Sequence, residues 1–183
     1  MPVYVSLLRG INVGGRNLIG MTALAEVYAK AGCTQVKTLL QSGNVVFRGS
    51  GSPAPLAKKL GDAIEVRFGV RPGLFLRTSA QLRAALLANP FPAEAKADPS
   101  HLVLLFFDGG PPAAAATTLA AWDRGPEQAK LAGGVLYIYY PEGMGRTKLT
   151  AAILDRALGG PGTARNFTTV TRLAALCKEL EPA

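Results

Sequence analysis

The stretch "VYVSLLRGINVGGRNLIG" (residues 3–20) contains both the first predicted element of the fold and the first candidate site. Its apolar beginning is typical of a β-strand. The strand pattern is followed by a loop rich in polar residues and glycine, with Arg9, Asn12, Gly14, Gly15 and Arg16. Glycine lets backbone N–H groups approach a ligand closely, and the planar arginine fork suits phosphate or carboxylate. The same composition is typical of a loop whose polar side chains hold their own backbone, so two interpretations stand.

Outward from this strand, the first half of the chain alternates strand and helix patterns in the order β-α-β-β-α-β. This is the split arrangement of ferredoxin-like folds. Thr22 and Ser52 are expected to cap the two helices, and Gly69 to end the second. A further helix is expected to stop at Asn89-Pro90. The predicted strands cover residues 3–8, 35–40, 44–47 and 73–78, and the two helices cover 22–31 and 52–69.

The second half repeats this order of elements. Gly133-Gly134 is typical of a hairpin turn between two of its strands. Strands are expected over 101–107, 127–132 and 135–140, a short extended piece over 163–166, and helices over 112–122, 147–158 and 168–180. We therefore predict an α+β protein of two ferredoxin-like β-α-β-β-α-β subdomains related by duplication, each with an appended helix.

The best linker candidate is the polar, proline-bounded segment 92–99. It would separate a basic ferredoxin-like subdomain over 1–91 from a second α+β subdomain over 100–183. A chain of this length also fits a single domain, so the alternative is one domain over 1–183.

The net charge of +8 lies in the first half of the chain. Residues 1–91 hold eleven Lys and Arg against three acidic residues, which is +8, whereas residues 92–183 hold nine of each sign. Such asymmetry favours an anionic partner, because a basic surface raises the local concentration of phosphates. The partner classes considered are an anionic small molecule and a nucleic acid. The competing explanation is that a surface needs some net charge for solubility.

Composition excludes several other classes. The longest apolar runs are too short to span a membrane, and the N-terminus resembles a strand and no secretory signal, so a cytoplasmic protein is expected. Cys33 and Cys177 are expected to be buried, reduced thiols. His101 is the single histidine, and with no Cys/His cluster neither a metal site nor a cofactor is predicted.

Three more polar clusters lie at predicted element ends. Gln41, Ser42, Gly43 and Asn44 form the turn before the third strand, where a structural role is favoured. In "GMGRTKL" (143–149), arginine and lysine enter a predicted helix, whose N-terminus attracts anions. The last cluster precedes the final helix, which Thr168 or Thr169 is expected to cap. The candidate residues in the second and third of these clusters are Gly145, Arg146, Lys148, Arg165 and Asn166.

Catalytic motifs are scarce. The chain has neither a G-x-S-x-G elbow nor a phosphate-binding P-loop, and its carboxylates at Asp98, Asp108, Asp123, Glu142 and Asp155 are not grouped. Tyr137 and Tyr139 alternate on one strand, where stacking against nucleic-acid bases is conceivable but core packing is favoured.

In order along almost the whole chain, "YVSLLRGINVGGRN", "LLQSGNVVF", "NPF", "GMGRTKL" and "RNFTTVTRL" resemble a bacterial family, domain of unknown function 1697. The resemblance implies a cytoplasmic α+β protein built from ferredoxin-like halves, with no established activity, substrate or cofactor. It puts weight on the same loops, including Gly10 in the first. Where relatives tend to have Trp after Arg-Asn, this chain has Phe167, which lacks the indole N–H donor.

Three functions are compatible with these features. The first is a binding module for a phosphate- or nucleotide-like anion or a nucleic acid, with Arg9, Arg16, Arg146 and Lys148 converging on one groove. The second is an enzyme of phosphoryl- or acyl-transfer type that uses the same loops to stabilise an oxyanion, although no general base is identified. The third is a protein-interaction or homodimerisation module.

Overall fold

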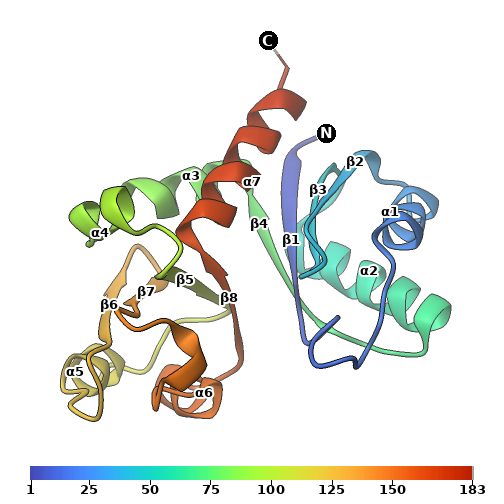
Figure 1. Cartoon of the computed structure of the whole chain (residues 1–183). Helices are drawn as coiled ribbons and strands as arrows, with labels where there is room; N and C mark the ends of the chain where they lie inside the picture. The colour runs from blue at the N-terminus through green and yellow to red at the C-terminus, as the bar shows by residue number, and fades with distance from the viewer. Residues whose placement is uncertain (183) are drawn as a thin grey trace. The chain divides into compact units, whose positions relative to one another are not determined.

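The computed structural model describes residues 1–182 of the chain, in which strands and helices form two four-stranded antiparallel sheets with helices packed against them (Figure 1). The α+β prediction is confirmed. The chain divides into two compact units. The first holds Met1–Arg83 together with the residues from Arg172 on, and the second holds Ala84–Thr171.

The first unit begins with six elements in the predicted order. They are β1 (Val3–Arg9), α1 (Met21–Lys30), β2 (Thr34–Leu39), β3 (Asn44–Arg48), α2 (Pro53–Phe68) and β4 (Gly73–Thr78). The sheet order is β2-β3-β1-β4, with antiparallel neighbours throughout. β1 is therefore a central strand, which explains its almost continuous apolar run.

One face of this sheet carries the core that α1 and α2 cover. Tyr4 and Leu8 of β1 and Phe47 of β3 pack there against apolar residues of the two helices, among them Leu24, Tyr28, Leu60 and Ile64. Ser6, which shares this face and is fully buried, accepts a hydrogen bond of 2.7 Å from the Tyr28 hydroxyl. The alternation of side chains along β1 thus selects the residues that meet the helices.

In the first unit, the predicted boundaries are confirmed for α2 but not for the start of α1. Ser52 and Gly69 flank α2 as predicted, and Gly69 adopts a left-handed φ of 70°. The prediction of Thr22 as the cap of α1 is wrong, because Gly20 occupies that position and Thr22 already lies inside the helix.

The second unit repeats the strand order of the first. Its sheet runs β6-β7-β5-β8, formed by β5 (Leu102–Phe107), β6 (Gln128–Ala132), β7 (Val135–Tyr139) and β8 (Gly162–Asn166). The extended piece predicted over 163–166 is β8, which pairs with β5 along its length. Two helices, α5 (Ala115–Ala120) and α6 (Ala151–Leu158), cover one face of this sheet. Both are shorter than predicted.

The segment 92–99, predicted as a linker, is instead occupied by helix α4 (Pro92–Ala97). Pro92 stands at its first turn, where a missing N–H costs nothing, and the following alanines favour a helix. The residue that precedes this segment, Phe91, packs in the second unit, where its buried ring lies 4.5 Å from the Lys130 ammonium group.

Two helices continue from one unit into the other. In α3 (Ser79–Leu87) the division falls after Arg83, and in α7 (Phe167–Leu180) it falls after Thr171. The compact units therefore differ from the predicted ranges of 1–91 and 100–183.

The end of α7 belongs to the first unit for a physical reason. Leu173, Cys177 and Leu180 are buried, and the carboxylate of Glu179 pairs with Lys37 of β2 at 2.7 Å. Glu181, just beyond the helix, pairs with Arg83 through both of its oxygens. An appended helix is thus present in the first unit, but it comes from the other end of the chain.

No helix in residues 1–182 is both long enough and apolar enough to cross a bilayer. Both cysteines are buried and free, as predicted.

The turn between β2 and β3 supplies a test of the fold. Gly43 has φ of 77°, and a Cβ placed there would lie 2.6 Å from Ile11 Cδ1 and 2.9 Å from Leu8 Cβ. Gly51 has φ of 95° with open space around it, so it carries the same backbone strain without the contacts. We expect Gly43→Ala to lower the free energy of unfolding by about 1–3 kcal/mol more than Gly51→Ala, measured by urea denaturation. Equal losses in the two variants would contradict this packing.

Candidate functional site

In the loop after β1, the glycine pair forms a tight hairpin. Val13 and Arg16 pair as an isolated antiparallel bridge, with Gly14 at φ 57° and Gly15 at φ 74° between them. A two-residue hairpin with positive φ at both central positions needs such residues. The glycines therefore have a structural role, whether or not a ligand approaches them.

Asn12 holds this loop to its neighbour. Its side-chain amide donates to the carbonyl oxygens of Ile19 (3.0 Å) and Gln41 (2.7 Å), and its carbonyl oxygen accepts from the Ile19 N–H (2.8 Å). The residue adopts a left-handed φ of 52°. These contacts support the interpretation that the polar side chain holds its own backbone.

The turn from Gln41 to Asn44 has the same character. Asn44 is fully buried, and its amide donates to the Leu39 carbonyl (2.7 Å) and the Ser42 hydroxyl (3.0 Å). Gln41 and Ser42 are exposed. The side chain of Asn44 thus stabilises the turn from within, and the backbone carbonyl of Gln41 accepts the hydrogen bond from Asn12.

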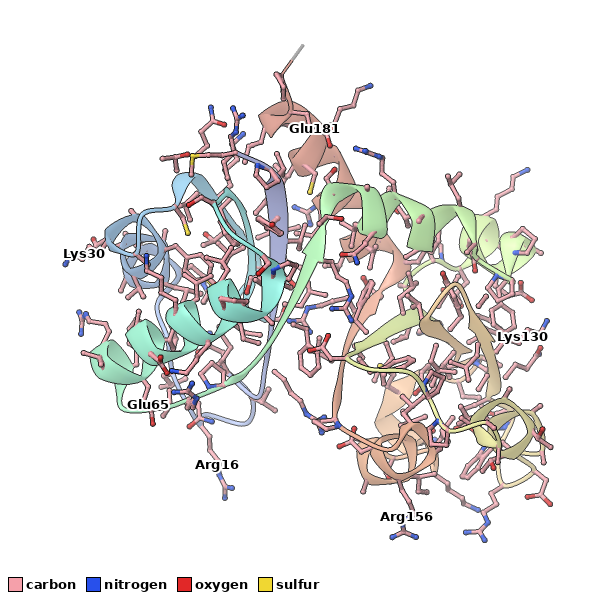
Figure 2. The ribbon with its side chains drawn as sticks, turned by 180° about the vertical axis from the view of Figure 1, so that it is seen from behind. Arg16, Lys30, Glu65, Lys130, Arg156 and Glu181 are labelled. Carbon is pink, nitrogen blue, oxygen red and sulfur yellow. The ribbon has the colours of Figure 1, made fainter. Side chains whose placement is uncertain are left out.

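The two arginines of the first loop lie in different surroundings. Arg9 ends β1 and lines a shallow hollow of about 460 Å³ together with Arg71. Arg71 is already paired with Asp62 and Glu65, each at 2.6 Å. Arg16 lies on the hairpin outside this hollow, and Figure 2 shows its side chain extending away from the ribbon.

A more compact cavity, of about 210 Å³, lies in the second unit between the segment before β6 and the segment after β7. Three cationic side chains line it, those of Arg124, Arg146 and Lys148. Two carboxylates, of Glu127 and Glu142, line it as well. The cavity therefore brings together two of the residues predicted from the "GMGRTKL" motif, and Gly145 lies between its lining residues in sequence.

The local structure of that motif differs from the prediction. A short 3-10 helix, η1 (Met144–Arg146), is followed by an extended residue at Thr147, and α6 begins only at Ala151. The Thr147 hydroxyl accepts from the Leu149 N–H at 3.0 Å and donates to Glu127. These hydrogen bonds hold the segment outside the helix. Arg146 and Lys148 therefore lie on a loop, and the predicted placement at a helix N-terminus is wrong.

Glu127 is the buried acid of this cavity, with 8% of its surface exposed. One carboxylate oxygen accepts from the Trp122 indole N–H at 2.9 Å, and the other accepts from the Thr147 hydroxyl. Desolvation by burial would raise the pKa of Glu127. The two hydrogen bonds, a backbone N–H and the charge of Lys148 outweigh it and hold the pKa below its ordinary value. Glu127 is thus an ionised acceptor and a poor proton-accepting base.

The predicted residues Arg165 and Asn166 lie outside this cavity. Arg165 is 9% exposed on β8 and donates to the Thr163 hydroxyl (3.0 Å) and the Ala164 carbonyl (2.8 Å). Burial lowers the pKa of its guanidinium to about 10. Asn166 accepts from the Thr169 N–H at 2.9 Å and so caps α7. The prediction of Thr168 or Thr169 as the cap is wrong, because the helix already begins at Phe167.

A second polar group, absent from the predicted sites, lies beside the cavity. His101 Nδ1 is 2.7 Å from Asp98 Oδ2, and the Tyr139 hydroxyl donates to the same oxygen at 3.4 Å. The other side of the imidazole faces Gly143, which lines the cavity. Asp98 thus orients the histidine, and the pKa of its carboxyl lies below its ordinary value because hydrogen bonds outweigh the opposing effect of desolvation.

Sequence patterns indicated neither Glu127 nor Arg124 as a site residue, and Asp98 was named only as one of several ungrouped carboxylates. Glu127 was predicted to be the first residue of the strand over 127–132, and no sequence motif connects it with Thr147, twenty positions later. Only the Asp98–His101 pair, three residues apart, had a local signal that could have been noticed. Within residues 1–182, no group of three or more His, Cys, Asp or Glu residues could hold a metal ion.

The low pKa of Glu127 predicts an acid-sensitive contribution to stability. Because the folded pKa is lowered, the contribution is complete above the ordinary pKa of 4.5 and is lost as pH falls through the folded value. We expect Glu127→Gln to flatten the decline in unfolding free energy below about pH 5. The measurement is urea denaturation across pH, with Glu94→Gln on α4 as the control. A variant that declines as steeply as the parent protein would argue against this pairing.

The comparisons with known proteins agree with the fold and do not assign a function. The conserved bacterial protein SP0830 from Streptococcus pneumoniae has a solved structure with a TM-score of 0.74 and 23% identity, covering 97% of this chain and 99% of that one. At that identity the likeness concerns the fold alone. A search of curated proteins finds no match. A family model described as a protein of unknown function, DUF1697, matches residues 1–137. The chain therefore belongs to the DUF1697 family.

Proposed function

We propose that the protein binds a small phosphate-bearing anion in the cavity of the second unit. The observation that carries this proposal is the gathering of Arg124, Arg146 and Lys148 around one cavity of about 210 Å³. Within the described part of the chain, none of these three side chains forms a hydrogen bond or an ion pair. Cationic groups that line one cavity repel one another, and a multivalent anion bound among them would relieve that repulsion.

The hydrogen-bond donors that line the cavity favour phosphate over a carboxylate. Three cations and two acids give a net charge of +1 if all are ionised. One of the acids, Glu127, is already engaged by Thr147 and Trp122, and Lys148 lies close enough to lower its pKa. Arginine can meet phosphate oxygens through two parallel N–H donors, and a phosphate monoester offers three terminal oxygens to the donors of Arg124, Arg146 and Lys148 where a carboxylate offers two.

The net positive charge of the first unit also supports binding of an anion. Its excess of positive charge would raise the local concentration of anions around the protein. The convergence of Arg9 and Arg16 with Arg146 and Lys148 on one groove stays a prediction. A nucleic-acid ligand is less favoured, because Tyr137 is fully buried and donates to the Ala85 carbonyl, so it offers no stacking surface.

The proposal is tested by calorimetric titration of the full-length protein with phosphate, pyrophosphate and ATP at low and high salt. We expect Arg146→Ala to weaken pyrophosphate binding by about tenfold, because a charge-assisted hydrogen bond is lost. Lys96→Ala is the matched control, since it removes one exposed cation of the same unit outside the cavity. The Lys96 variant should bind like the parent protein.

Two results would overturn the proposal. One is the absence of phosphate and pyrophosphate binding at low salt. The other is an equal loss in the Arg146 and Lys96 variants, which would indicate attraction by overall charge and no specific cavity.

An enzyme of phosphoryl- or acyl-transfer type is the second candidate, favoured by the Asp98–His101 pair beside Gly143. An imidazole oriented by a carboxylate is suited to general acid–base catalysis, which contributes roughly a hundredfold or more. We expect His101→Gln to reduce hydrolysis of p-nitrophenyl phosphate or p-nitrophenyl acetate by about that factor. If the parent protein hydrolyses neither ester, or if the His101→Gln variant hydrolyses them at the same rate, the enzyme hypothesis is wrong.

We also propose that both units are ferredoxin-like folds related by duplication, in a cytoplasmic protein. The support is the repeated order of elements: β1-α1-β2-β3-α2-β4 corresponds to β5-α5-β6-β7-α6-β8. Each sheet places its first strand between the third and fourth. This antiparallel order is typical of the split β-α-β motif, and its occurrence in both units supports duplication of one ancestral unit.

A further inference from the structure

An apolar groove of about 530 Å³ lies on the second unit between α5 and α6. Small side chains, such as those of Ala115, Thr118 and Ala157, leave the space open, and Leu119 and Ile153 give it an apolar floor. Trp122 forms part of its wall. Arg156 stands at the rim, and Figure 2 shows its side chain extending outward from α6.

This groove adjoins the charged cavity. Arg124 lines both. Trp122 lines the groove, while its indole N–H donates to Glu127, which lines the cavity. Leu149 lines the groove, and its neighbour Lys148 lines the cavity. A ligand with one charged and one apolar end could therefore lie across the boundary at Arg124.

We propose that the ligand is a soluble phosphate monoester with an apolar substituent, whose phosphate binds in the charged cavity and whose substituent lies in the groove beside Trp122. This inference rests on the proposed function, because it extends the same site. Each part of the ligand meets a matching environment: phosphate meets Arg124, Arg146 and Lys148, and the apolar part covers surface that is otherwise in contact with water. Pockets that combine an apolar wall with a few convergent polar groups are the common form of small-molecule sites.

The experiment compares inorganic phosphate with ethyl, butyl and hexyl phosphate, which share one anion and differ in apolar length. Trp122 is the only tryptophan in the sequence, so tryptophan fluorescence reports on the wall of this groove. We expect affinity to rise by roughly threefold to tenfold for each pair of methylenes, less than full burial would give because the groove is open. The fluorescence change should appear with butyl and hexyl phosphate and be small with inorganic phosphate.

A pair of neighbouring variants tests the groove itself. Thr118 and Thr117 are both exposed residues of α5, but only Thr118 lines the groove. Thr118→Leu should fill part of the space and remove most of the gain from butyl to hexyl phosphate, while inorganic phosphate binds as before. Thr117→Leu should leave the whole series unchanged.

The outcomes separate this inference from the proposed function. If inorganic phosphate does not bind at all, the proposed function fails. If phosphate binds and affinity does not rise with chain length, only the apolar subsite is wrong. An equal effect of the two threonine variants would also refute the subsite. Vesicles that contain phosphatidate distinguish the source, and binding to vesicles without binding of free alkyl phosphates would overturn the proposal of a soluble ligand.

Discussion

The arrangement of the second unit depends on the hydrogen bonds that the buried carboxylate of Glu127 accepts. An ionised carboxylate taken out of water costs several kcal/mol unless it is paired and hydrogen-bonded. Trp122 and Thr147 supply the hydrogen bonds, and each carries a different segment with it. Thr147 holds the loop that bears Arg146 and Lys148, whereas Trp122 fixes the end of α5. One carboxylate therefore positions both the charged cavity and the wall of the apolar groove.

In the first unit, asparagine side chains hold the loops through hydrogen bonds to the backbone. Asn12 and Asn44 direct their side-chain amides to backbone carbonyls, and the left-handed backbone at Asn12 and Gly43 allows two loops to meet closely. Such contacts stabilise loops that would otherwise leave polar groups unpaired. Glycine and asparagine in a family motif can thus indicate positions where the backbone adopts a left-handed conformation, with no ligand required. The cations at the cavity are different, because within residues 1–182 their side chains form no such hydrogen bond to the backbone.

Much of the fold could be predicted from the sequence, because strand and helix patterns depend on neighbouring residues. The central strands β1 and β5, the hairpin turns and the order of elements all followed from local patterns, as did the ends of α2. The wrongly predicted start of α6 depends on a distant contact, because Thr147 bonds to Glu127, twenty residues earlier. The start of α7 depends on a local contact, because Asn166 accepts from the N–H of Thr169 three residues later. Both helices have capping residues near their N-termini, but the local sequence was compatible with more than one first residue of the helix.

By itself, the sequence determined the α+β class, the repeated order of elements and the basic first half, and it predicted Arg146 and Lys148 as candidate site residues. These properties follow from composition and from periodicity along the chain. Only the tertiary structure decided that Glu127 and Arg124 join the loop that carries these two residues, that an apolar groove adjoins it, and that the end of α7 belongs to the first unit. The reason is physical: a cavity is formed by side chains far apart in sequence, and their meeting depends on which surfaces the fold buries.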